Sequence, residues 1–218
     1  MKPRLDDSRR IIPLATWARA ALFRSFRAFE DPCFTVSVEL NILPLRRLAE
    51  ERGDSFFLLA LFAISEAYNA VPEMRMRFAG DDAVAEYAVA HPSAPLMTAD
   101  GENYLQVTLP YAPTFAEFAR VAAPVVEAVR RGNASGQALE ADVPNCFCAS
   151  CVPWISAAGY VPATYMKNQD IHVLTWFGVT PAGTTLLSCR FNHCFTDGLH
   201  VSRFFSRVAE NFARPERL

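Results

Sequence analysis

Residues 34–42 constrain the fold more than any other stretch of this sequence, because apolar and polar residues alternate along them without a break. Successive side chains of a β-strand point to opposite faces, so this alternation predicts a strand with one buried face and one polar face. Such a strand needs an apolar layer against its buried side. The sequence therefore predicts a β-sheet that is covered on one face.

The covering layer is predicted by segments in which apolar residues recur at helical spacing. Residues 45–52 are predicted to form a short helix that Gly53 closes. Ser55 is predicted to cap an apolar helix that runs to about Val71, where Pro72 stops it. Two more helices are predicted at residues 114–132 and from about Leu199 onward.

Further strands are predicted at residues 105–109, 146–155, 171–177 and 186–191. Strands and helices do not alternate regularly and no internal repeat occurs, which disfavours a Rossmann array or a solenoid. The prediction is an α/β fold of two layers, a sheet with helices on one face.

Length and charge limit the number of domains and the kinds of partner. A chain of 218 residues builds one large core or two small ones, and no linker-like stretch divides this one. Residues 1–218 are therefore expected to form a single domain. A net charge of -2 provides no broad positive field, so neither nucleic acid nor a membrane is an expected partner. The charged start leads into no apolar signal segment, and the expected location is the cytoplasm.

Three of the six cysteines, Cys146, Cys148 and Cys151, form a Cys-x-Cys-x-x-Cys run. One interpretation is a metal or thiol site, but no second Cys or His cluster completes a four-ligand set, and no metal is expected. The alternative is that the thiols are small apolar side chains along a buried strand.

The chemistry is expected at residues 191–198. If Leu187, Cys189 and Phe191 face inward, the period of two places His193 on the same side, where the strand ends. An imidazole there can face a cavity while packing holds its ring.

Asp197 and Gly198 are predicted to open the last helix, because a carboxylate suits the positive end of the helix dipole. The alternative from this local pattern is a core histidine beside an ordinary helix cap. His91, His172 and His200 stand in no comparable pattern and are expected to be dispensable for catalysis.

The pattern His193-x-x-x-Asp197-Gly198 resembles the signature of the chloramphenicol acetyltransferases, which is shared more loosely with dihydrolipoyl acyltransferases and condensation domains of peptide synthetases. The resemblance covers essentially the whole chain, since other segments fall in the order and spacing of the chloramphenicol type: residues 17–19, 73–77, 109–111 and 149–154. It implies the CoA-dependent acyltransferase fold, a mixed β-sheet covered by helices.

The resemblance also implies a direct transfer of acetyl from acetyl-CoA to a hydroxyl acceptor, chloramphenicol or a related small alcohol, in a ternary complex. His193 matches the general base of that reaction, a role that suits imidazole because it titrates near neutrality. Ser150 matches the hydroxyl that stabilises the tetrahedral oxyanion. The alternative for Ser150 is a serine that bonds to backbone in a buried strand.

Other matched positions brace the base or line the acceptor pocket. Arg19 and Asp197 match a pair that joins the start of the chain to the turn after the base, and we expect a buried ion pair in which the planar guanidinium makes two bonds. Thr175 matches a threonine that holds a water near the intermediate. The aromatic positions of the acceptor pocket are matched by Phe26, Phe34 and Tyr104.

Three departures from the family pattern bear on the acceptor more than on the chemistry. Asn192 stands where the family typically has the first of two histidines, Phe26 replaces a tyrosine, and Glu30 puts a charge where an apolar residue is usual. A changed pocket can discriminate strongly between acceptors. The same departures leave open a protein on this fold that binds a small ligand without turnover.

The resemblance implies a homotrimer with active sites between neighbouring subunits, and a role in antibiotic resistance. The 17 phenylalanines agree with this assembly, because shared interfaces would cover apolar surface that one small core does not need.

Overall fold

The computed structural model describes residues 5–133, 144–163 and 169–218 of the chain. A six-stranded sheet with the order β2-β9-β8-β7-β5-β6 forms its centre. These strands are β2 (Cys33–Asn41), β5 (His91–Met97), β6 (Tyr104–Thr108), β7 (Cys146–Val152), β8 (Val173–Phe177) and β9 (Thr184–Asn192). The sheet is mixed, because β7 runs parallel to β5 and β8 while the other neighbours are antiparallel.

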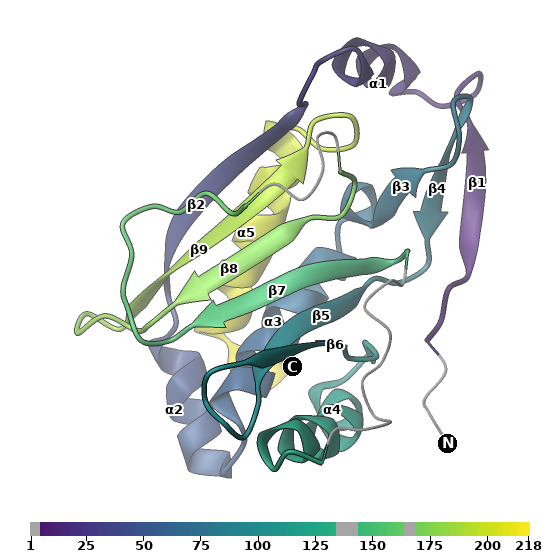
Figure 1. Ribbon diagram of the computed structural model, residues 1–218. Helices are drawn as coiled ribbons and strands as arrows, with labels where there is room; N and C mark the ends of the chain where they lie inside the picture. Colours follow the sequence, from purple (N-terminus) through teal and green to yellow (C-terminus); the bar gives the residue numbers. More distant parts are fainter. Residues whose placement is uncertain (1–4, 134–143, 164–168) are drawn as a thin grey trace.

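Helices cover one face of this sheet, which confirms the predicted two-layer α/β architecture (Figure 1). They are α2 (Leu43–Arg52), α3 (Phe56–Asn69), α4 (Phe115–Arg130) and α5 (Gly198–Ala213). The helix α3 is buried along most of its length, since it lies between the sheet and its neighbours. Within the described residues, none of the helices is long and apolar enough to cross a membrane.

The strand predicted from alternation is β2, within one residue at each end. Its apolar residues Val36, Val38 and Leu40 pack against the main core, and its partner β9 contributes Leu187 and Cys189 to the same core. The polar residues of β2 lie on the other face, where Ser37 donates a hydrogen bond to Ser188 over 3.0 Å.

The predicted helix ends also agree with the structure. Gly53 has a φ of 69°, the left-handed conformation that glycine adopts without steric cost and that closes α2. Ser55 accepts the Leu58 N–H at 3.4 Å and caps α3, while Thr114 caps α4. The helix α3 ends at Asn69, close to the predicted end at about Val71, and the Asn69 side chain bonds to the backbone of Ala90.

A second sheet was not predicted. It consists of β1 (Arg9–Pro13), β4 (Ala83–Tyr87) and β3 (Met76–Phe78) in the order β1-β4-β3, and the short helix α1 (Ala20–Arg27) follows β1 (Figure 1). These elements are short, and α1 buries only Ala20 and Phe23, so their periodicity is weak. The strand β5 was missed because Pro92 and Pro95 lie within it.

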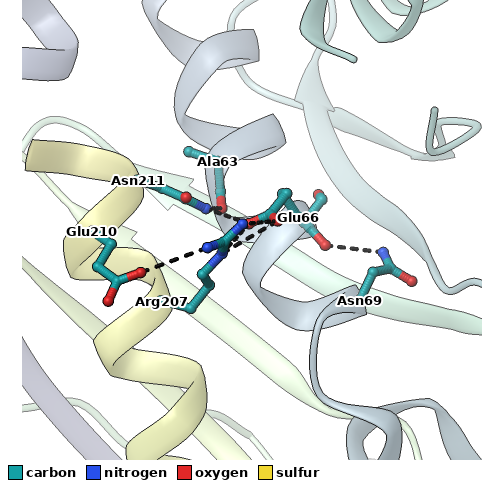
Figure 2. A network of polar contacts seen from close by, with 7 residues as sticks. Ala63, Glu66, Asn69, Arg207, Glu210 and Asn211 are labelled. Carbon is teal, nitrogen blue, oxygen red and sulfur yellow. Dashed lines mark hydrogen bonds and ion pairs between the residues drawn. The ribbon is translucent and has the colours of Figure 1, made fainter. Parts of the chain in front are cut away.

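A polar network joins α3 to α5 on the outer side of the helix layer (Figure 2). Arg207 donates to both carboxylate oxygens of Glu66, and Asn211 donates to Glu66 and to the Ala63 carbonyl. Partial burial alone would raise the pKa of Glu66, but the bonds from Arg207 and Asn211 lower it. The network therefore holds in place the helix that begins immediately after Asp197.

Two buried histidines are expected to make the fold sensitive to acid. His91 bonds to the Asp6 carbonyl through Nε2 and accepts the Tyr111 N–H at Nδ1. Burial lowers the pKa of His91, and burial together with the nearby Arg77 lowers the pKa of His172 to about 3. The unfolded chain therefore takes up protons below its ordinary histidine pKa that the folded chain refuses.

The free energy of unfolding should accordingly be constant near neutrality and fall from about pH 6.5 toward pH 3, by up to about 1.4 kcal/mol per pH unit for each histidine. Urea unfolding at pH 7 and pH 5 measures this dependence. The variant His172→Gln should show a shallower loss than the parent protein. Equal slopes in the two proteins would show that His172 is not the source.

Candidate active site

His193 follows the last residue of β9 and lies against two aromatic rings. Its ring is stacked on Phe26 of α1, with centroids 3.9 Å apart and planes 8° apart, and it lies 4.7 Å from the ring of Phe34. Phe34 is in turn stacked on Phe191 at 5.6 Å. Leu187, Cys189 and Phe191 of β9 face the core, as the strand period predicted, and His193 is the next residue in that series.

The backbone of His193 is held by a hydrogen bond, and one of its two ring nitrogens is buried. The backbone N–H of His193 donates to the carbonyl of Pro32 at 3.0 Å, which joins the end of β9 to the start of β2. The Nδ1 atom is buried and has no hydrogen-bond partner among the described residues. Nε2 is therefore the ring nitrogen that can meet a substrate.

Asp197 is the N-cap of α5 and pairs with Arg19, as expected. Arg19 Nη1 lies 2.8 Å from Asp197 Oδ2, which confirms the ion pair. The expected burial of the pair is wrong, since the two side chains are 18% and 31% exposed. Partial burial alone would raise the pKa of Asp197, but the bond from Arg19, the nearby His200 and the Leu199 N–H lower it.

The predicted two-bond geometry of this pair is wrong. The other oxygen, Asp197 Oδ1, accepts the Leu199 N–H at 3.0 Å as the helix cap and does not bind the guanidinium. Arg19 Nε and Nη2 are buried without a partner among the described residues. The Asp197 carboxylate thus pairs with Arg19 through Oδ2 and caps α5 through Oδ1.

Ser150 and Thr175 lie away from His193 within one chain. They form part of a row of hydroxyl groups on the face of the sheet opposite the helices, in register on neighbouring strands: Ser150, Thr175, Ser188 and Ser37. Ser188 precedes His193 by five residues. Two strand spacings and five residues of rise separate Ser150 from His193 by roughly 20 Å.

Tyr104 lies farther still from His193. It begins β6, the strand at the opposite edge of the sheet from β2, and it is 62% exposed. The described chain thus brings Arg19, Phe26, Phe34 and Asp197 to the end of β9 with His193. Ser150, Thr175 and Tyr104 are held elsewhere on the same sheet.

A cavity of about 610 Å³ opens at the carboxyl ends of β7 and β8. Its walls include Trp154, Trp176 and the ring of Phe57, which is stacked on Trp176 at 5.9 Å. Arg46 and Arg130 also line it, together with Glu50, whose Oε1 pairs with Arg46 Nε at 2.9 Å. Cys151, the residue after Ser150, lines the cavity. Sequence periodicity could not reveal the cavity because its lining comes from many elements.

The cysteine run does not gather into one cluster. Cys146 and Cys148 occupy alternate positions of β7, whereas Cys151 is on the other face and packs against the main core. Burial raises the pKa of the Cys151 thiol to about 12, and mainly burial raises those of Cys33 and Cys194 to about 11. Among the described residues, no three His, Cys, Asp or Glu side chains are grouped closely enough for a metal ion.

The fold is shared with solved acyltransferases. One structure named chloramphenicol acetyltransferase superposes with a TM-score of 0.84 at 24% identity, over 93% of this chain and 99% of its own. A probable dihydrolipoamide acetyltransferase from Listeria monocytogenes superposes with a TM-score of 0.62 at 18% identity, over 90% of each chain. The protein therefore has the fold of the CoA-dependent acyltransferases.

The sequence comparison narrows this class to a family. The family model described as Chloramphenicol acetyltransferase matches residues 9–209, and the chain belongs to that family of acyltransferases. A chloramphenicol acetyltransferase of Streptomyces acrimycini is 26% identical, with 94% of each chain covered. Chloramphenicol acetyltransferase 2 of Escherichia coli is also 26% identical, over 90% of this chain and 93% of its own.

Proposed function

We propose that this acyltransferase carries acetyl from acetyl-CoA to the hydroxyl of chloramphenicol or a related small alcohol, with His193 as general base. The observation that carries the proposal is the placement of His193, whose ring lies against Phe26 and Phe34 at the end of β9. The names of the relatives support chloramphenicol as the acceptor. A role in antibiotic resistance would follow from its acetylation.

The reaction needs one base and one oxyanion donor. In a ternary complex, Nε2 of His193 takes the proton of the acceptor hydroxyl while that oxygen attacks the thioester carbonyl of acetyl-CoA. The tetrahedral intermediate expels the CoA thiolate, which recovers the proton from the imidazolium, so the products are the acetyl ester and CoA. Ser150 stabilises the oxyanion by a hydrogen bond, and Thr175, its neighbour on β8, holds a water nearby.

We propose that the working site forms between copies of the chain, where His193 of one subunit meets Ser150 of the next. The roughly 20 Å between these residues within one chain supports this, because a base and an oxyanion donor must both contact one small intermediate. Apolar residues exposed just after β7 also fit an interface: Trp154, Ile155 and Val161.

The protein is accordingly expected to be a homotrimer, whose neighbouring subunits also place Tyr104 and the other aromatic residues of the acceptor pocket. Sedimentation at micromolar concentration measures the assembly. An active monomer would contradict the shared site. We further propose that residues 1–218 act as one domain and that the protein works in the cytoplasm.

The cavity beside Ser150 is the proposed site of acetyl-CoA. Its apolar and aromatic walls suit the pantetheine and the adenine, and Arg46 and Arg130 can bind the phosphates. Replacement of Arg130 by Met should therefore raise the KM for acetyl-CoA more than it lowers kcat.

An acceptor screen tests the proposed function. The purified protein is incubated with acetyl-CoA and a panel of alcohols that includes chloramphenicol, and release of the CoA thiol is measured. Ester formation with at least one alcohol is expected. Binding of an alcohol without thiol release would favour the alternative, a protein that binds a small ligand without turnover.

A further inference from the structure

We propose that Asn192 and His200 are positioning residues for His193, because their side chains hold the two ends of the turn that carries the base. The inference rests on the proposed role of His193. Neither side chain needs to touch the substrate. Each instead bonds to a backbone N–H of residues 193–197, the segment between the end of β9 and the start of α5.

Every backbone N–H of this segment has a partner. The N–H of His193 donates to Pro32, and those of Phe195 and Thr196 donate to the Asn192 carbonyl. The two remaining groups are held by side chains: the Cys194 N–H donates to Asn192 Oδ1 at 2.8 Å and the Asp197 N–H donates to His200 Nδ1 at 3.1 Å. Loss of either side chain would leave an amide of the turn unpaired.

Asn192 anchors the first end of the turn to a separate part of the chain. Its side chain is almost fully buried, and its Nδ2 donates to the carbonyl of Gln169 at 2.9 Å while its Oδ1 accepts from Cys194. The carboxamide is therefore oriented from both sides. This explains how an asparagine can serve where the family pattern has histidine, since both side chains offer an acceptor and at least one donor.

His200 anchors the second end of the turn. It is the third residue of α5 and completes a capping box, in which Asp197 caps the helix and the His200 ring accepts the Asp197 N–H. Nδ1 lies 3.1 Å from the Asp197 N and 3.0 Å from Asp197 Oδ1, and Nε2 faces Glu73 Oε1 at 3.4 Å. In the tautomer in which Nδ1 accepts the Asp197 N–H, the ring proton lies on Nε2 and points to Glu73. The other oxygen of Glu73 is buried without a partner among the described residues, so this carboxylate needs the donor.

Through its contact with Glu73, His200 links the turn that carries His193 to the short helix η1 (Pro72–Arg75). Arg19 approaches the same cap from α1 and binds the opposite oxygen of Asp197. The sequence offered no reason to single out His200, which was expected to be dispensable. The structure assigns it to the set of contacts that fix the position of His193.

Paired variants of similar size test this role. His200→Gln keeps an acceptor at the position where capping boxes ordinarily carry Glu or Gln, whereas His200→Met has the same length without an acceptor. Asn192→His still offers an acceptor and a donor, whereas Asn192→Leu keeps only the branched shape of the asparagine side chain. We expect the Met and Leu variants to lose about 10–100-fold in kcat with little change in the KM for acetyl-CoA, because a displacement of about 1 Å can cost about 10²-fold in rate.

The Gln and His variants should stay within a few-fold of the parent kcat. The matched control is Thr114→Val, which removes the N-cap of α4 away from His193 and should lower the melting temperature without lowering kcat. If the Met or Leu variant does not fold, the alanine variant, which removes the same bond without new bulk, replaces it.

The outcomes separate this inference from the proposed function. An inactive His193→Ala protein alongside fully active Met and Leu variants would overturn the positioning role and leave the general base intact. Equal losses in the Gln and Met variants would show that the acceptor is not what matters at position 200. Turnover by His193→Ala would instead remove the mechanism on which the inference rests.

Discussion

Replacing His193 by alanine is expected to abolish acetyl transfer while the fold and acetyl-CoA binding stay nearly intact. The ring is stacked on Phe26 at the end of β9 and is only partly buried, so its loss opens little space in the core. General-base catalysis contributes about 10²–10⁴-fold in rate. The imidazole also positions the attacking hydroxyl, so we expect a loss at the upper end of this range or beyond it.

Steady-state thiol release and equilibrium binding of acetyl-CoA measure these two effects separately. A loss confined to kcat is expected, because the proton transfer occurs in the transition state and not in the bound ground state. Circular dichroism is the control for folding. Retention of more than about a tenth of the parent turnover, a smaller loss than general-base catalysis accounts for, would rule out this mechanism.

Replacing Ser150 by alanine is expected to lower kcat by about 10²–10³-fold with little change in substrate affinity. The range is that of a single deleted oxyanion donor. Ser150 stands on β7 in a row of hydroxyl groups, and the change removes one oxygen from a partly exposed strand position. The fold should therefore tolerate it.

Ser37 supplies the matched control for Ser150. It lies at the far end of the same row, on the edge strand β2, and donates only to Ser188. Ser37→Ala should keep kcat within about threefold of the parent, well below a single-donor loss. Similar losses in both variants would mean that the row acts through sheet structure, and Ser150 would not be the oxyanion donor.

The parts of this protein that its sequence determined are those set by residues a few positions apart. The unbroken alternation of β2, the left-handed Gly53 after α2 and the Asp197 cap of α5 all follow from backbone geometry and short-range bonding. The position of His193 at a strand end follows in the same way from the period of two. The resemblance of His193-x-x-x-Asp197-Gly198 to the family signature adds the expected chemistry, because these residues lie in the turn between β9 and α5.

The parts that only the tertiary structure decided depend on segments far apart in the chain. Whether Ser150 lies near His193 depends on the strand order of the sheet, and that order separates them. The single bond between Arg19 and Asp197 arises because the helix cap occupies the second oxygen. His200 acquires its role only because Glu73 of η1 packs against the start of α5. The residues next to a side chain in sequence do not determine which remote groups form its remaining hydrogen bonds. Those remote groups determine what the side chain does in the folded protein.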